Sequence, residues 1–203
     1  MSTEGSDAGT QDFLQLLSYG IGHEFAQPLA AIRMTLATID ADDPELVEPE
    51  QIMSAAVALM QDRVSDLTTL VRLAMDQPLA SGRASLTPCA DAVMREPGSS
   101  GRCGRADVAV EGEPVVSGDP DALSLATRGL IRTALKLCGD PPVRMAADSA
   151  DGFEGVSVRY FGPHPRKTFD ISAAELIAKK HGGRLDIATV DGATTLRLLV
   201  PGA

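Results

Sequence analysis

A histidine followed directly by a glutamate is the pair of side chains in this sequence best suited to chemistry. His23 and Glu24 lie in the middle of a long helical pattern, and His23 is two residues from both Ile21 and Phe25, off the apolar stripe. We expect the imidazole to face solvent, where its neutral form can attack a phosphoryl group. Glu24 can hydrogen-bond to the attacking ring or act as a base toward it.

A proline inside the same helical pattern supports a functional interpretation of this pair. Pro28 follows shortly after His23. In a helix interior, proline removes a backbone hydrogen bond and crowds the preceding turn, at a cost of about 3 kcal/mol or more. A bend needed just after His23 would explain why the sequence tolerates that cost. For the His-Glu pair taken alone, two solvated side chains on a helix are the simpler alternative.

The remaining histidines and the cysteines are expected to be structural or solvated. His164 lies in a loop flanked by prolines, and His181 lies at the end of a predicted helix. Cys89, Cys103 and Cys138 form no Cys-x-x-Cys pair and no Cys/His spacing typical of a metal site. We therefore predict no resident metal, and thiols that behave as small hydrophobes.

Composition and charge exclude several classes of function. The formal net charge is −10, and an acidic surface repels both nucleic-acid phosphates and anionic membranes. No run of about 18 apolar residues occurs, and the polar, acidic segment at 1–10 is unlike a signal peptide. The charge therefore makes nucleic acid and membranes unlikely partners. The odd number of cysteines and the lack of an export signal predict a cytoplasmic protein.

Two long amphipathic segments must position His23. In the first, at about 11–39, apolar side chains recur at steps of three and four and so share one helical face. A second such segment runs from about 49 to 75, after a turn at 40–44 that is rich in caps and breakers. These patterns predict a helical hairpin over 11–76. Because one hairpin cannot cover both apolar stripes, we expect two hairpins to pair as a four-helix bundle in a homodimer.

After a linker at 77–83, the pattern changes to mixed helices and strands, which predicts a second domain over 84–203. Strands are predicted at 85–88, 107–110, 114–116, 143–147, 155–160, 184–189 and 194–200. The fold class is therefore α+β, with helices over one face of a mostly antiparallel sheet.

Three helices are predicted in this second domain. One starts near 91–95. A longer helix runs to about Leu137, with Asp119 as its N-cap and Pro120 at its first position. The last helix covers 172–180 and ends at the following His-Gly-Gly sequence.

The string from His23 to Ile32, His-Glu-Phe-Ala-Gln-Pro-Leu-Ala-Ala-Ile, closely resembles the phosphoacceptor box of sensor histidine kinases. It looks most like the branch that includes nitrogen, oxygen and dicarboxylate sensors. The resemblance implies that His23 accepts the phosphoryl group, that Glu24 is its base or orienting group, and that Pro28 bends the helix.

The second domain resembles the ATP-binding domain of the same kinases, a kinase-type ATPase α/β sandwich, but its nucleotide site is degenerate. The helix at 119–137 tracks the one that carries the family's asparagine box. Gly129 and Thr133 stand at its two asparagine positions, the second of which normally helps to hold Mg²⁺. Thr133 is a poor substitute for that asparagine.

Three further positions depart from the family's pattern. Tyr160 stands where an aspartate recognises adenine. Thr168 and Asp170 occupy positions of the glycine-rich turn under the phosphates, and only a short segment replaces the family's long lid. Loss of glycine blocks close backbone approach, and the Asp170 carboxylate puts negative charge where phosphate would bind. The resemblance therefore implies no ATP use and no cofactor.

These observations favour a histidine phosphotransferase that relays a phosphoryl group between response-regulator receiver domains through a phosphohistidine. The receivers would supply their own Mg²⁺. A sensor histidine kinase is a further candidate partner. One alternative is a non-catalytic pseudo-histidine-kinase that binds and regulates a kinase or a response regulator. Another is a sensor kinase core with a divergent site.

Overall fold

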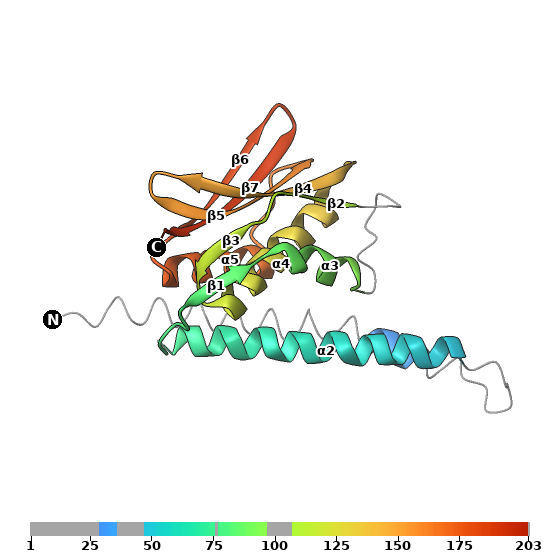
Figure 1. The fold of residues 1–203 in the computed structure, drawn as a ribbon. Helices are drawn as coiled ribbons and strands as arrows, with labels where there is room; N and C mark the ends of the chain where they lie inside the picture. Colours follow the sequence, from blue (N-terminus) through green and yellow to red (C-terminus); the bar gives the residue numbers. More distant parts are fainter. Residues whose placement is uncertain (1–28, 36–46, 76, 97–106, 203) are drawn as a thin grey trace, which may run out of the picture. The chain divides into compact units, whose positions relative to one another are not determined.

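The computed structural model describes residues 29–35, 47–75, 77–96 and 107–202. The chain divides into two compact units, Met1–Ala74 and Met75–Ala203. His23, Glu24 and Pro28 lie outside the described residues. Figure 1 shows the elements of both units in chain order.

In the first unit, the described residues are helical. Residues 29–35, which continue the sequence after Pro28, form helix, and the Thr35 hydroxyl donates to the Ala31 carbonyl at 2.9 Å. The helix α2 covers Val47–Ala74, close to the predicted 49–75. Most of the predicted first helix, 11–39, lies outside the described residues.

The second unit contains a five-stranded sheet with the strand order β2-β4-β5-β7-β6. The strands are β2 (Val108–Glu111), β4 (Asp140–Ala150), β5 (Phe153–Phe161), β6 (Arg184–Val190) and β7 (Ala193–Pro201). β2 runs parallel to β4, and the other neighbours are antiparallel. A separate antiparallel pair is formed by β1 (Gly82–Ser85) and β3 (Val115–Gly118).

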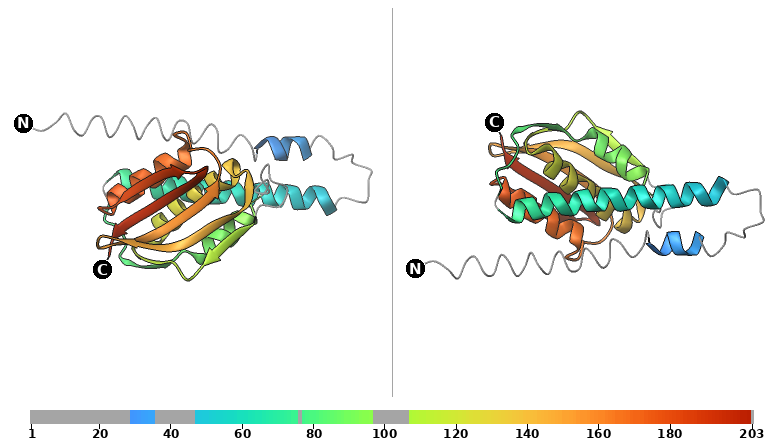
Figure 2. Two further views of the ribbon diagram at one scale, coloured as in Figure 1. Left: turned by 90° about the horizontal axis from the view of Figure 1, so that it is seen from above. Right: turned by 90° about the horizontal axis from the view of Figure 1, so that it is seen from below.

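Three helices, α3 (Thr87–Met94), α4 (Pro120–Leu137) and α5 (Phe169–Lys180), lie on one face of this sheet, and no described element of the second unit covers the other face, here called the open face (Figures 1 and 2). The core between helices and sheet is mostly aliphatic, and Tyr160 and Phe169 are its buried aromatic side chains among the described residues. Its fully buried side chains include Leu123, Leu130, Ile131, Met145, Val156, Val158, Tyr160, Ile177, Leu196 and Leu198. The alternation of strand side chains between this core and the open face confirms the predicted α+β arrangement.

Two hairpin turns connect four of the five strands in pairs. Asp151 and Gly152 join β4 to β5 with φ angles of 52° and 81°, and Asp191 and Gly192 join β6 to β7 with 51° and 76°. Positive φ at both central residues is the geometry of a type I′ turn, for which Asp-Gly is a preferred sequence. The turn at Asp151 and Gly152 thus connects the two strands, β4 and β5, that carry Arg144 and Arg159 in register.

The predicted helix around Asp119 is confirmed, whereas two other predictions were wrong in detail. The Asp119 side chain accepts from the Ala122 N–H at 3.2 Å, so it is the N-cap of α4. The predicted strand at 85–88 is wrong, because β1 ends at Ser85 and Pro88 lies in the first turn of α3, where proline is well tolerated. α5 begins earlier than predicted, at Phe169, because the Thr168 side chain caps it.

Candidate functional site

Two of the positions that the sequence predicts to be degenerate, Gly129 on α4 and Asp170 on α5, lie against each other. A Cβ atom added at Gly129 would lie 3.2 Å from both Cβ and Oδ1 of Asp170. That is closer than ordinary van der Waals contact, so a side chain at position 129 would require Asp170 to shift by a few tenths of an ångström. Gly129 therefore has a packing role in this protein. It lets the start of α5 approach α4 closely.

A buried ion pair lies beside this contact. Arg132 donates from Nε and Nη2 to Asp170 Oδ1, at 3.2 and 2.9 Å, and from Nη1 to Glu96 Oε1 at 3.0 Å. Arg132 and Asp170 are each only 5% exposed. A buried carboxylate is tolerated when it is paired and hydrogen-bonded in this way.

This geometry corrects the expectation for Asp170. Its carboxylate was expected to act as a negative charge facing a phosphate position, but it is neutralised by an arginine of the neighbouring helix. Lys136, whose side chain is largely exposed, adds a weaker contact at 3.8 Å. The sequence prediction missed Arg132 as a partner, although its position between Gly129 and Thr133 on the predicted helix was a usable signal.

The two threonines at degenerate positions have different environments. Thr168 is the N-cap of α5, and its Oγ1 accepts from the Ile171 N–H at 3.4 Å. Thr133 is buried within α4, with 4% of its surface exposed. Thr133 therefore belongs to the packed core, whereas Thr168 is exposed and uses its hydroxyl to cap α5.

Comparisons with known proteins bear on the fold. No family model and no curated protein sequence matches the chain. Among solved structures, the Acinetobacter baumannii histidine kinase AdeS superposes with a TM-score of 0.61 and 12% identity, over 89% of this chain and 98% of that chain. Full-length ShkA in complex with AMPPNP gives 0.57 and 14% identity, over 93% of this chain and 46% of that chain.

The chain has the fold of a histidine kinase core. The sequence resemblance predicted this fold, and the prediction is confirmed at the level of the fold. Identities this low say nothing about activity, so the function depends on the residues that line the site.

In this histidine kinase fold, Tyr160 is a core residue. It is 1% exposed, and its hydroxyl donates to the Pro163 carbonyl at 2.9 Å. Burial raises its pKa above the usual value for tyrosine, so the phenol stays neutral and acts as a donor. At the position where the resemblance places an adenine-binding aspartate, this chain has a buried hydroxyl that donates a hydrogen bond to its own backbone.

The chain after Tyr160 closes directly onto the end of α4. The Gly139 N–H donates to the Phe161 carbonyl at 2.8 Å. A Cβ added at Gly162 would lie 2.4 Å from the Leu137 carbonyl oxygen and 3.1 Å from the Tyr160 ring. Any side chain at position 162 would clash with the Leu137 carbonyl oxygen, so only glycine permits the chain after Tyr160 to pass this close to the end of α4.

His181 is a structural histidine, as predicted. Its Nε2 accepts from the Asp119 N–H at 3.0 Å, so the ring proton is on Nδ1, which lies 2.8 Å from the Ile177 carbonyl oxygen. Both ring nitrogens are therefore engaged, and neither lone pair is free for attack. His164 is exposed, and its Nδ1 lies 3.4 Å from Thr189 Oγ1.

The cysteines within the described part of the chain agree with the prediction of small buried thiols. Cys89 and Cys138 are buried, and burial raises the pKa of Cys89. Cys103 lies outside the described residues. Among the residues described, no group of His, Cys, Asp or Glu could hold a metal ion, and no helix is long and apolar enough to cross a membrane.

An exposed apolar stripe runs along α2 in the first unit. Val57, Val64 and Val71 are 48%, 53% and 37% exposed, and they are spaced seven residues apart. Met60 and Leu67 lie between them and are partly exposed. β-branched residues at one heptad position and Leu or Met at the next apolar position are typical of paired helices.

Proposed function

We propose that this chain is a cytoplasmic histidine phosphotransferase that uses His23 as its phosphoryl carrier. In the first step the phosphorus–oxygen bond of a receiver's aspartyl phosphate breaks, and a phosphorus–nitrogen bond to the His23 imidazole forms. In the second step a receiver aspartate takes the group from phosphohistidine. The protein needs mainly to position His23 in line, since a receiver brings its own Mg²⁺ and acidic pocket.

The observation that carries this proposal is the packing of α4 against α5. Gly129 and Asp170 are in close contact, and Arg132 holds the Asp170 carboxylate with two nitrogen donors. Because Gly129 and Asp170, two positions of the expected nucleotide site, are packed against each other, we propose that the phosphoryl group comes from a donor other than ATP. The His23 box supplies the acceptor in this account.

The experiment that tests the proposal uses phosphorylated receivers. The full chain is incubated with receivers from the same genome that carry ³²P on aspartate, and the label on this chain is measured over time. The expected result is label that is lost in acid and kept in alkali, as for phosphohistidine, and that passes to a second receiver. Stable binding of a kinase or receiver without any label would favour the non-catalytic alternative.

We predict that the chain does not bind ATP usefully. The Arg132–Asp170 pair would have to separate and the buried Tyr160 would have to move before a nucleotide could enter. Calorimetric titration with Mg-ATP should give no measurable heat of binding at submillimolar nucleotide. A micromolar dissociation constant would revive the divergent-kinase alternative.

We also propose that α2 contributes to a homodimer through its exposed valine stripe. Placing a carboxylate at the middle of that stripe, as in Val64→Asp, would bury two like charges close together in the dimer. We expect the dimer to weaken by about 100-fold or more, measured by light scattering across a concentration series. Ser65→Asp is the matched control, because Ser65 is exposed beside the stripe. A wild-type chain that is monomeric at micromolar concentration would contradict the proposal.

A further inference from the structure

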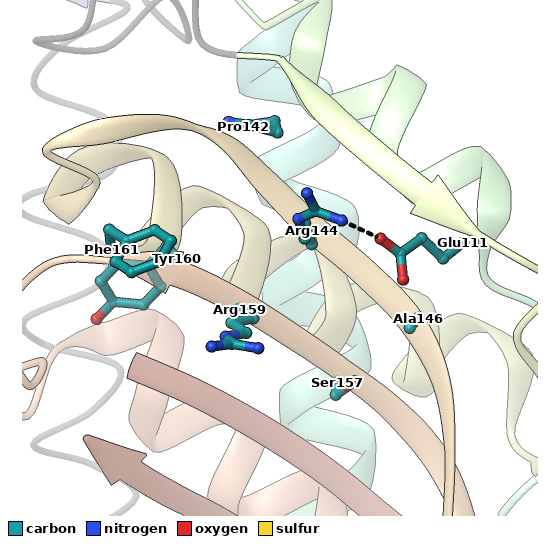
Figure 3. Close-up of a pocket in the computed structure, with 8 residues that line it drawn as sticks. All are labelled: Glu111, Pro142, Arg144, Ala146, Ser157, Arg159, Tyr160 and Phe161. Atoms are coloured by element: carbon teal, nitrogen blue, oxygen red, sulfur yellow. Dashed lines mark hydrogen bonds and ion pairs between the residues drawn. The ribbon is translucent and has the colours of Figure 1, made fainter. Parts of the chain in front are cut away.

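The open face of the sheet carries a groove that the phosphotransfer proposal does not use. It has a volume of about 420 Å³ and lies over β2, β4 and β5, on the face opposite the helices (Figure 3). Its floor consists of Ala146 and Ser157, which are directly opposite each other on neighbouring strands. Because both side chains are small, the sheet surface is hollow there, and longer side chains form the walls.

Two arginines of this groove are placed against each other by the register of the sheet. Arg144 of β4 and Arg159 of β5 are direct cross-strand partners. Like charges directly opposite on one face of an antiparallel pair are destabilising, so an anion between them would stabilise the arrangement. Glu111 binds only one of them. It accepts from Arg144 Nη1 at 2.6 Å.

Arg159 is exposed and has no hydrogen-bond or ion-pair partner among the described residues. Figure 3 shows Arg159 on β5 among the side chains that line the groove, with Arg144 on the neighbouring strand. A guanidinium offers a planar pair of donors that matches a carboxylate. The groove therefore contains the Arg159 guanidinium, whose donors are unpaired among the described residues, next to the Arg144 guanidinium, which Glu111 partly neutralises.

An exposed aromatic ring lies at the end of the same groove. Phe161 is 53% exposed and follows Arg159 by two positions on the same strand, so both side chains are on the open face. Two positions along a strand span about 6.7 Å. An extended peptide with an acidic residue, and an apolar residue two positions further, would present its two side chains at the same spacing.

We infer that this groove binds an extended acidic segment of a partner protein, with a carboxylate on Arg159 and an apolar side chain on Phe161. A peptide fits better than a small molecule, since sites for small molecules usually bury most of the ligand, whereas Arg144 and Phe161 stay more than half exposed. The chain as a whole has a net charge of −10 and repels acidic peptides in general. Binding of an acidic peptide would therefore be due to the local pair of Arg144 and Arg159 and not to the overall charge.

The test measures binding of short fluorescent peptides to the full chain by anisotropy. The probe peptide is Gly-Glu-Ser-Phe-Gly, and its matched control is Gly-Glu-Phe-Ser-Gly, in which the acidic and aromatic side chains point to opposite faces. Arg159→Glu should weaken binding of the probe by about 10-fold or more, because charge-assisted hydrogen bonds are lost. Lys179→Glu, an equal charge change at an exposed position on α5, should leave binding unchanged.

Thermal melting of both variants confirms that they are folded, as expected for exposed positions. The proposal is overturned if the probe does not bind, or if Arg159→Glu and Lys179→Glu have equal effects. It is also overturned if the two peptides bind equally well. Displacement of the probe by low concentrations of inorganic phosphate would overturn it in favour of a small-anion site. None of these outcomes depends on phosphotransfer through His23.

Discussion

Replacement of His23 by alanine abolishes phosphoryl transfer between receivers, while the dimer and its melting temperature stay nearly unchanged. This is the expected result for a solvent-facing carrier, because surface substitutions usually change stability by no more than about 0.5 kcal/mol. The measurement is the transfer of ³²P from a phosphorylated receiver to this chain, separated on gels, alongside light scattering and thermal melting of the same preparations.

His164→Ala is the matched control for this experiment. His164 is exposed, and among the described residues its one polar contact is with Thr189 at 3.4 Å, so its loss should leave transfer at the wild-type rate. His181 is unsuitable as a control, because both of its ring nitrogens are engaged in the fold. If His23→Ala still accepts phosphate from a receiver, the carrier lies elsewhere and the proposed role of His23 is wrong.

Neighbours of His23 should give graded effects. Glu24→Ala is expected to slow transfer by about 100-fold or more if the carboxylate acts as a general base, and by less if it only orients the ring. Pro28→Ala should stabilise the helix and yet reduce transfer, if Pro28 bends the helix after His23 as the sequence predicts. Comparing the two rates with the two melting temperatures separates the chemical role from the conformational one.

Asp170→Ala is expected to destabilise the second unit by about 3 kcal/mol, because it leaves the buried Arg132 guanidinium without its main carboxylate. Glu96 still accepts one hydrogen bond from Arg132, which keeps the loss toward the lower end of the range for broken buried pairs. In a domain of this size, the melting temperature should fall by about 10 °C, measured by calorimetry or circular dichroism.

Two controls show whether the loss comes from the uncompensated charge. Lys136→Ala removes a largely exposed partner at 3.8 Å from Asp170 and should have an effect of about 0.5 kcal/mol or less. The double variant Arg132→Met with Asp170→Ala removes both charges and should recover most of the stability lost in the single variant. If Asp170→Ala had the same melting temperature as Lys136→Ala, the Arg132–Asp170 ion pair would contribute little to stability.

The sequence could predict elements wherever local chemistry determines them. Asp119 and Pro120 marked the start of α4 because a capping carboxylate and an N1 proline act within one turn. The Gly-Gly after His181 marked the end of α5 in the same way. Pro88 was misassigned to a strand because proline suits a strand edge as well as a first helical turn, and only the packing of α3 chooses between them.

The sequence by itself determined the histidine-kinase-like plan and the candidate residues, since helix periodicity, caps and the His23 string are all local patterns. The tertiary structure alone decided what the degenerate positions do. The contacts of Gly129 with Asp170, and of Asp170 with Arg132, join residues of different helices, and the direct opposition of Arg144 and Arg159 depends on strand register. The helix contacts join segments far apart in the sequence, which no local pattern encodes, whereas the arginine pairing follows from the Asp151-Gly152 turn once β4 and β5 pair.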